Sequence, residues 1–282
     1  MLPLQSAIDE RMISFPNAKI NLGLNITEKR PDGYHNIESV LYPVPLCDIL
    51  EIIIAPDKQF EFRSSGLNTD CKEADNLCVK AYNLLHEHFD TPPVKMWLHK
   101  IIPSGAGLGG GSADAAFTLC MLDKIFNLEL GKPKLIELAT ILGMDCPFFV
   151  DNLPALATGR GDVLTPLDFS LKGHTICIAR PNIHISTAEA YAGAIAHPGE
   201  ICLASLTAYS ASSWRGKLYN QFEETLFVKF PQLQSLKDSF YDSGAVYASL
   251  SGSGSAVYGI FTSAPDLHAK FEDNFYWEGE LG

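Results

Sequence analysis

Five glycines occur among the seven residues 105–111, between two strongly apolar segments. Before them, residues 94–102 have the pattern of a β-strand. After them, residues 112–122 are Ala-rich and almost wholly apolar, which predicts a buried helix with Ser112 near its N-cap. A strand, a glycine loop and a helix in this order present backbone N–H groups and a helix N-terminus to an anion. We therefore predict a phosphate-binding loop at residues 103–113, since a merely flexible turn seldom leads straight into so apolar a helix.

The glycine spacing by itself leaves open which phosphate ligand the loop binds. Gly105, Gly107 and Gly110 fit the dinucleotide fingerprint G-x-G-x-x-G. That motif requires an acidic residue at a strand end about 20 residues later, whereas Asp123 and Glu129 follow the predicted helix instead. A Walker A loop is excluded because no Lys-Ser or Lys-Thr pair follows the glycines. These arguments leave open a phosphate ligand held by a loop of another type, such as the ATP of a small-molecule kinase.

A kinase also needs a group that orients or deprotonates the acceptor hydroxyl, and positive charge near the transferred phosphoryl group. Asp145, which we expect to leave a helix just before Pro147, is a candidate base. Residues 18–26 alternate between apolar and polar or small side chains, which predicts a half-buried strand with Lys19 and Asn21 on one face. A Lys19–Asp145 pair would keep the carboxylate ionised. Taken alone, Asp145 is more typical of a residue that forms a turn, and Lys19 is more typical of a solvated residue at a strand edge.

Strands and helices follow one another without regular alternation, so the predicted fold class is α+β rather than a doubly wound parallel sheet. We place the domain boundary at residues 159–161, which gives a domain 1–160 containing the phosphate loop and a domain 161–282. The predicted strands are residues 18–26, 37–46, 49–55, 60–63, 94–102, 175–179, 246–250 and 256–261. The predicted helices are residues 75–88, 112–122, 133–142, 220–230, 233–240 and 265–275, with one more that begins at the capping box Ser186-x-x-Glu189.

Composition excludes several classes of protein. The chain is 46% apolar and 19% charged, as in ordinary globular proteins. Its net charge of −12 argues against nucleic-acid or membrane partners, which need a basic face. No segment resembles a membrane helix, and residues 1–12 do not resemble a signal peptide. Seven cysteines with no C-x-x-C pair predict reduced, mostly buried thiols, no metal site among the protein side chains, and a cytoplasmic location. Nothing favours a monomer over a homodimer.

A second glycine-rich segment, residues 251–255, lies between two predicted strands. Gly252 and Gly254, with three serines around them, either close a hairpin or allow a ligand to approach the backbone. Both interpretations stay open. His86 and His88 are two positions apart on a predicted helix and cannot share a face, so we assign them no site.

Three segments taken together resemble the GHMP kinases (galactokinase, homoserine kinase, mevalonate kinase and phosphomevalonate kinase). They are the strand with Lys19, the loop PSGAGLGGGSADAA and the late segment SLSGSGSAVYG. The resemblance spans nearly the whole chain. It implies an N-terminal domain like the second domain of ribosomal protein S5 and a ferredoxin-like C-terminal domain. It also implies phosphoryl transfer from ATP with Mg²⁺, with Asp145 as the base and Lys19 as its partner.

The segment NAKINLGLNITEKRPDGYHNIES is similar to the opening of those members that phosphorylate the C2 hydroxyl of 4-diphosphocytidyl-2-C-methyl-D-erythritol, in the non-mevalonate isoprenoid pathway. This resemblance implies a small-molecule partner with a cytidine diphosphate group. Tyr34 and His35 would recognise the cytidine end, and Tyr191 would stack on the cytosine ring. The implied substrate-binding residues are Asn21, Tyr34, His35, Thr187, Tyr191, Gly252 and Ser253. The implied ATP-binding residues are Pro103, Ser104, Gly105, Ala106, Gly107, Leu108, Gly109, Gly110, Gly111, Ser112 and Ala113, with Asn76 at the adenine.

Two other hypotheses remain open. The chain could phosphorylate a small acceptor such as homoserine or mevalonate, which would have no use for Tyr34, His35 and Tyr191. It could also be a non-catalytic nucleotide-binding module, which would have no use for Asp145 and Lys19.

Overall fold

The computed structural model describes residues 11–68, 71–197, 199 and 201–282. These residues form two compact units whose segments interleave along the chain. Unit 1 consists of the segments up to Asn17, Cys47–Pro103 and Gly110–Asp151; unit 2 consists of Ala18–Leu46, Ser104–Gly109 and Asn152–Gly282. The domain boundary at residues 159–161 stays a prediction. The N-terminal segment that we compared with signal peptides lies largely outside the described residues.

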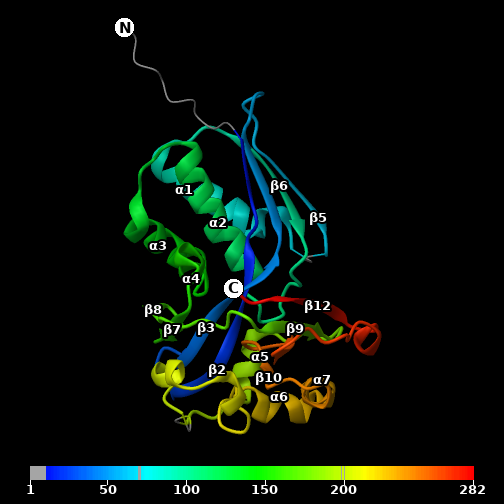
Figure 1. Cartoon of the computed structure of the whole chain (residues 1–282). Helices are drawn as coiled ribbons and strands as arrows, with labels where there is room; N and C mark the ends of the chain where they lie inside the picture. Colours follow the sequence, from blue (N-terminus) through cyan, green and yellow to red (C-terminus); the bar gives the residue numbers. More distant parts are fainter. Residues whose placement is uncertain (1–10, 69–70, 198, 200) are drawn as a thin grey trace. The chain divides into compact units, whose positions relative to one another are not determined.

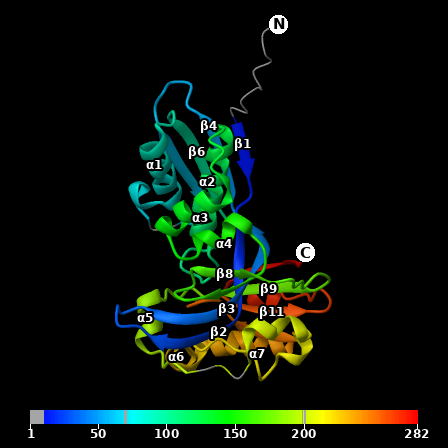
Figure 2. The same ribbon diagram turned by 90° about the vertical axis from the view of Figure 1, so that its left-hand side faces the viewer.

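Unit 1 is a four-stranded sheet with helices on one face (Figures 1 and 2). The strand order is β1 (Arg11–Ser14), β4 (Ile49–Ile54), β6 (Val94–Lys100) and β5 (Glu61–Gly66). β5 runs parallel to β6, and the other pairs are antiparallel. The helices are α1 (Leu77–Phe89), α2 (Gly110–Ile125), α3 (Gly131–Leu142) and α4 (Cys146–Asp151). Their apolar faces pack with Leu50, Met96 and Leu98 of the sheet in one core, which positions the start of α2 at the end of β6.

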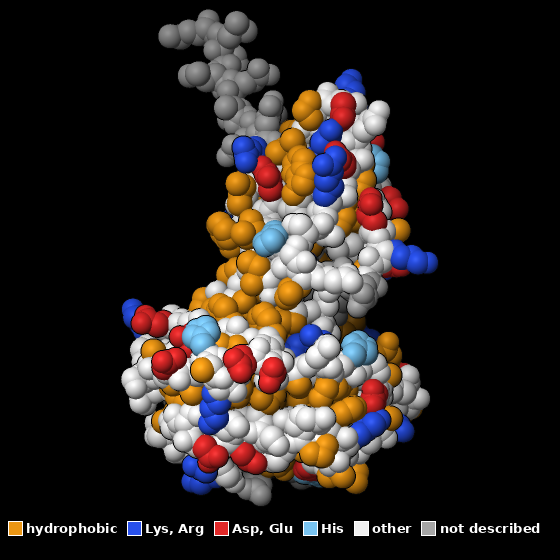
Figure 3. Space-filling model, turned by 90° about the vertical axis from the view of Figure 1, so that its right-hand side faces the viewer, with side chains coloured by type: hydrophobic (Ala, Val, Ile, Leu, Met, Phe, Trp, Pro, Cys, Tyr) orange, Lys and Arg blue, Asp and Glu red, His pale blue; other side chains and the backbone are white. Residues whose placement is uncertain are grey.

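The opposite face of this sheet carries a mixture of apolar and charged side chains, visible in the upper part of Figure 3. One cross-strand row runs through Ile13, Glu51, Trp97 and Arg63, which lie opposite one another in register. Ile13 is half exposed. Because side chains alternate between the two faces of a strand, the same strands that build the core of unit 1 also display this outer row.

Unit 2 contains two four-stranded sheets. The first has the order β2 (Asn17–Lys29), β3 (His35–Cys47), β7 (Ala155–Thr158) and β8 (Val163–Pro166). The second has the order β10 (Tyr247–Leu250), β11 (Val257–Phe261), β9 (Thr175–Arg180) and β12 (Phe275–Glu280), with all pairs antiparallel. The helices are α5 (Thr187–Ala192), α6 (Glu223–Lys229) and α7 (Pro231–Asp242). One core joins Ile26 of β2 to Phe222, Phe240 and Val257, so the N-terminal strand is built into the C-terminal half of the chain.

The predicted α+β class is confirmed, as are most predicted elements. Strand β2 contains residues 18–26, and β6 and α2 flank the glycine loop as predicted. Ser186 caps α5: its side-chain oxygen accepts a hydrogen bond of 3.1 Å from the backbone N–H of Glu189. α2 begins at Gly110, two residues before the predicted N-cap Ser112. Within the described part of the chain, no helix is both long and apolar enough to cross a membrane.

The predicted helix at residues 265–275 is wrong. The structure has only a short 3₁₀ turn at Ala269–Phe271, followed by strand β12. Tyr276 and Trp277 of β12 pair with Ala179 and Ile178 of β9. The sheet edge offered by β9 overrides the helical spacing of the apolar residues, because strand preference depends on the neighbours that a segment meets.

Three further predictions need correction. Strand 18–26 is not half-buried: both of its faces are covered, and Lys19 and Asn21 are each 3% exposed. The chain does leave α3 after Leu142, but helical geometry resumes at Cys146, where α4 begins, although Pro147 is expected to disfavour it there. Pro147 is tolerated in the first turn, where its missing N–H has no acceptor within the helix. The seven cysteines are free but not mostly buried, since Cys71 and Cys202 are exposed and two others are half-buried.

Candidate active site

The glycine loop adopts a backbone that other residues would not readily adopt. Gly105, Gly107 and Gly109 have φ angles of +62°, +77° and +72°. A Cβ atom at Gly107 would lie 1.9 Å from the carbonyl oxygen of Ser251, closer than any real contact. The glycines therefore serve two purposes: they permit left-handed backbone, and they let the loop approach the turn after β10.

The loop carbonyls are bound by the protein on one side. Leu108 O accepts from Lys19 N at 2.9 Å, Ala106 O accepts from Ala256 N at 3.0 Å, and Gly107 O accepts from the Ser251 hydroxyl at 2.9 Å. In a trans peptide the C=O and the following N–H point in opposite directions. The N–H groups of Gly107, Leu108 and Gly109 therefore point away from β2 and from the turn, as a phosphate cradle requires.

Lys19 and Asn21 lie together on β2 in a buried polar network. Lys19 Nζ donates to Asn21 Oδ1 at 2.6 Å, and Asn21 Nδ2 donates to the Ser39 hydroxyl at 2.8 Å. The Ser39 hydroxyl in turn donates to the Gly23 carbonyl at 2.7 Å. The predicted pairing on one strand face is confirmed. Because Asn21 is fixed from the other side by Ser39, it holds the ammonium group of Lys19 in one position.

The second glycine segment is a hairpin turn between β10 and β11 that also packs on the loop. A Cβ atom at Gly252 would lie 3.2 Å from Gly107 O and 3.3 Å from Asn21 Oδ1. Asn220 fixes the turn by donating to the carbonyls of Leu250 and Gly252, at 3.0 and 2.7 Å. Unit 2 thus brings together β2, residues 106–108 of the loop and the Gly252 turn, three segments that lie far apart in the sequence.

The aromatic candidates also lie in unit 2. The His35 and Tyr191 rings stack with their centroids 4.7 Å apart and an angle of 17° between their planes. Tyr191 meets Phe222 edge to face at 4.9 Å. Burial, with a smaller effect from the charge of Lys29, lowers the pKa of His35, so its imidazole is neutral at pH 7. Tyr34, beside His35, is 55% exposed.

Thr187 and Ser253 connect the aromatic group with the glycine turn. Their hydroxyl oxygens lie 3.5 Å apart, which joins the start of α5 to the turn after β10. Since Tyr191 lies on the same helix as Thr187, the structure places every predicted substrate-binding residue in unit 2.

Asp145, Ser112 and Asn76 belong to unit 1. Asp145 immediately precedes α4 and is half-buried. The Ser112 hydroxyl, in the first turn of α2, is a hydrogen-bond partner of the Cys146 thiol, whose pKa burial raises to about 12. The residue that follows the candidate base is therefore in contact with the first turn of α2. Asn76 caps α1: its side-chain oxygen accepts from Cys78 N at 2.9 Å. The Lys19–Asp145 pair and the adenine contact of Asn76 stay predictions.

A buried charge cluster lies beneath the start of α2 in unit 1. Lys100 Nζ pairs with Asp48 Oδ2 and, at 2.7 Å, with Asp114 Oδ2. Asp48 Oδ1 also accepts from the backbone N–H of Ile102 at 2.8 Å. Burial raises the pKa of Asp114, although the charge of Lys100 opposes the increase. The cluster joins the end of β6 to Asp114 in the N-terminal half of α2, so it fixes both ends of the glycine loop.

Sequence reasoning missed several residues near these sites. His184 lies beside the loop, because a Cβ atom at Gly105 would be 3.4 Å from its ring. Asn220 and Ser251 fix the glycine turn, and Arg160, which we assigned to a domain boundary, lies over Tyr34 at 5.5 Å. A single histidine or arginine in a loop belongs to no sequence pattern from which such contacts could be predicted.

Two family models match the chain. The model of the GHMP kinases N terminal domain matches residues 76–152, and the model of the GHMP kinases C terminal domain matches residues 202–276. The chain belongs to the GHMP kinase family, and it is a kinase with the two-domain α+β architecture of that family.

Two similar proteins and one similar crystal structure are named as the same enzyme. A 4-diphosphocytidyl-2-C-methyl-D-erythritol kinase of Bacteroides fragilis is 48% identical over 273 residues, which cover 96% of this chain and 100% of the relative. A protein of the same name from Porphyromonas gingivalis is 49% identical, with 95% of this chain and 98% of the relative covered. A crystal structure of a 4-(cytidine 5'-diphospho)-2C-methyl-D-erythritol kinase matches with a TM-score of 0.83 at 29% identity, over 96% of this chain and 99% of that one. The mevalonate kinase of Methanococcus jannaschii shares the fold, with a TM-score of 0.73 at 15% identity over 99% of this chain and 100% of that one.

Proposed function

We propose that this chain transfers the γ-phosphoryl group of ATP to the C2 hydroxyl of 4-diphosphocytidyl-2-C-methyl-D-erythritol, giving the 2-phosphate and ADP. This is a step in the supply of isoprenoid precursors by the non-mevalonate pathway. The observation that carries the proposal is the similarity to kinases named for this substrate, 48% identity over the full length of one relative. The arrangement of the described residues supports it.

The glycine loop and α2 would hold the ATP phosphates. The N–H groups of Gly107, Leu108 and Gly109 point away from β2, and the N-terminus of the 16-residue helix α2 follows directly. Both features favour an anion in the absence of a Walker A lysine. Pro103 to Ala113 form this site in the proposal, with Asn76 at the adenine.

Asp145 would accept the proton of the attacking hydroxyl, and Lys19, its proposed partner, would neutralise developing charge. Asn21 supports this role for Lys19, because it accepts from Nζ at 2.6 Å and so fixes the position of the ammonium group. The reaction needs little covalent chemistry from the protein, so alignment of acceptor and phosphate provides most of the rate enhancement.

Mg²⁺ is the expected cofactor of the nucleotide. This ion prefers oxygen donors, keeps several waters and is often bound mainly by the substrate phosphates. The Ser112 hydroxyl, placed by the first turn of α2, fits that donor set and is the residue that we propose contacts the ion. When bound, Mg²⁺ neutralises charge on the transferred phosphoryl group.

Tyr34, His35 and Tyr191 would select the cytidine end of the acceptor. The stacked His35–Tyr191 pair and the exposed ring of Tyr34 offer flat apolar surface to a pyrimidine. Thr187, Gly252 and Ser253 lie between this group and Asn21 and would contact the rest of the substrate. The cytoplasmic location and the absence of nucleic-acid and membrane partners stay predictions.

The test is ADP release from the purified protein with ATP, Mg²⁺ and 4-diphosphocytidyl-2-C-methyl-D-erythritol, with homoserine, mevalonate and galactose as parallel acceptors. We expect turnover with the cytidyl substrate alone. Turnover with homoserine or mevalonate instead would show that the acceptor class is wrong. ATP binding with no turnover on any acceptor would show a non-catalytic nucleotide-binding module.

A further inference from the structure

Tyr34 lies on a turn that is tightly organised by charged residues. The turn follows β2, and the backbone N–H of Tyr34 donates to Asp32 Oδ1 at 3.1 Å. Arg30 holds Asp32 through contacts of 3.0 to 3.2 Å and also donates to Asn36 Oδ1 at 3.1 Å. These contacts fix the backbone of the turn. None of these contacts involves the half-exposed phenol ring of Tyr34, so the position of the ring depends on a further contact.

Arg160 provides that contact from a second turn, between β7 and β8. Its guanidinium carbon lies 5.5 Å from the centroid of the Tyr34 ring, within the range of a cation–π interaction. Asp162 orients the guanidinium group: its Oδ2 accepts from Nη2 at 2.8 Å and from Nε at 3.2 Å, and its Oδ1 accepts from the backbone N–H of Arg160 at 3.0 Å. The group that faces Tyr34 is therefore itself held in place.

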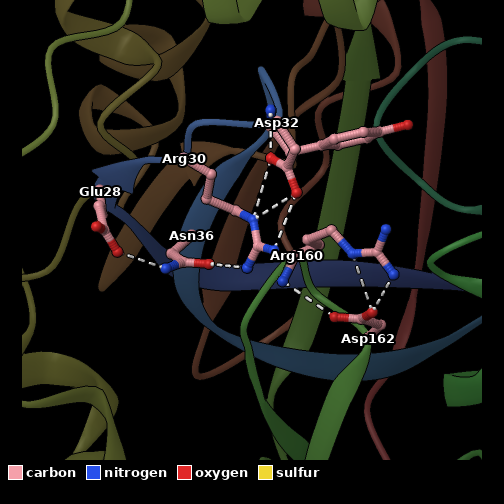
Figure 4. Close-up of polar contacts among 7 residues, drawn as sticks. Glu28, Arg30, Asp32, Asn36, Arg160 and Asp162 are labelled. Atoms are coloured by element: carbon pink, nitrogen blue, oxygen red, sulfur yellow. Dashed lines mark hydrogen bonds and ion pairs between the residues drawn. The ribbon is translucent and has the colours of Figure 1, made fainter.

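The two turns are joined directly. Ile37 N, just after the first turn, donates to Gly159 O at 2.7 Å. The ion pairs Arg30–Asp32 and Arg160–Asp162 lie next to each other (Figure 4). The hydrogen bond from Arg30 is the main cause that lowers the pKa of Asp32, and the charge of Arg160 adds to it. The side chain of Arg160 is 34% exposed and that of Asp162 is 18% exposed, so the contact is only partly screened by water.

We propose that Arg160 is a positioning residue for the pyrimidine end of the acceptor. It covers one face of the Tyr34 ring and keeps the opposite face available for stacking with cytosine. This inference rests on the proposed function. It gives the turn between β7 and β8 a role in substrate specificity, although this turn carries no sequence motif. Because Arg160 acts through Tyr34, its loss should weaken binding of the acceptor without affecting ATP or the chemical step.

The experiment compares Arg160→Met with wild type in steady-state kinetics with the cytidyl substrate. We expect the KM for the acceptor to rise about two- to fivefold, as for a partly exposed cation–π contact, with kcat and the KM for ATP unchanged. Arg160→Lys keeps a cation over the ring and should restore most of the loss. The matched control is Arg215→Met, since the Arg215 guanidinium lies 4.2 Å from the ring of Tyr241 on α7, which belongs to no predicted site.

A double-mutant cycle with Tyr34→Leu separates this role from a general effect on folding. In the Tyr34→Leu background, Arg160→Met should change the acceptor KM no further, because the ring on which it acts is gone. Equal effects of Arg160→Met in both backgrounds, or a fall in kcat alone, would overturn the inference and leave the proposed function standing. A wild-type protein that neither turns over the cytidyl substrate nor binds CDP in calorimetry would overturn both.

Discussion

At the scale of single residues, the conformation of the glycine loop depends on Gly107. Its φ of +77° and its approach to Ser251 require a residue without a Cβ atom. We expect Gly107→Ala to lower the melting temperature and to weaken ATP binding at least tenfold. The left-handed backbone alone costs a non-glycine residue about 1–2 kcal/mol, and the clash adds to this. Thermal unfolding and nucleotide titration measure the two effects.

Gly216→Ala is the matched control for Gly107→Ala. Gly216 has a φ of +76°, and a Cβ atom there would meet nothing within 4 Å. It should show the backbone cost alone and leave ATP binding intact. If both variants bound ATP like wild type, the loop would not be the nucleotide site.

A second prediction at this scale concerns Asp145. Asp145→Asn should lower kcat by about 10²–10⁴, the usual contribution of a general base, while ATP affinity stays close to that of wild type. Asp151→Asn, at the other end of α4, is the control, because Asp151 pairs with Lys132 at 2.7 Å on the surface. Rapid-quench or ADP-release assays report kcat. Full activity in Asp145→Asn would remove this carboxylate from the mechanism.

At the scale of elements, the charge cluster of Asp48, Lys100 and Asp114 joins the end of β6 to α2 on either side of the glycine loop. Lys100→Met would leave two carboxylates buried without a counter-ion, which typically costs about 3–5 kcal/mol of the free energy of unfolding. Urea denaturation measures this loss. Lys95→Met, on the same strand but in the exposed pair with Asp57, should unfold like wild type. Equal stability of the two variants would show that the cluster does not hold the element junction.

The same cluster predicts a pH dependence of stability. Burial raises the pKa of Asp114 to about 7, above its ordinary value of 3.8, and its Oδ1 has no hydrogen-bond partner among the described residues. The folded state therefore binds this proton more tightly than the unfolded state does. The resulting stabilisation is complete below about pH 4 and is lost as the pH rises to about 7, with a slope of up to about 1.4 kcal/mol per unit. Urea unfolding across this range should show the slope in wild type and a flatter profile in Asp114→Asn.

At the scale of the whole molecule, the two compact units interleave along the chain, so one cut should not separate them. Residues 161–282 alone lack β3 and also β2, and Leu24 and Ile26 of β2 pack in the core with Cys177 and Phe222. We expect this fragment to be unfolded by near-UV circular dichroism. Addition of residues 1–160 as a second chain should restore the signal. A fragment 161–282 that folds cooperatively by itself would contradict the interleaved arrangement.

Much of the fold and of the site could be predicted because the signals are local. The glycine spacing at residues 105–111 and the apolar run behind it predict a loop and a helix from steric rules and burial alone. The alternation around Lys19 predicts β2, and the Ser186–Glu189 pair predicts the start of α5. β12 could not be predicted, because its conformation depends on the free edge of β9, which lies about a hundred residues earlier in the chain.

The sequence by itself determined the glycine loop between β6 and α2, the strand that carries Lys19 and Asn21, and the family to which the chain belongs. Each depends on residues that are close together in the chain or on a motif of fixed spacing. Only the tertiary structure decided that the Gly252 turn packs on the loop, that both faces of β2 are buried, and that His35 stacks on Tyr191. The contact of the Gly252 turn with the loop and the His35–Tyr191 stack each join residues more than a hundred positions apart, and they form because hydrophobic burial brings such segments together without leaving a local pattern in either one.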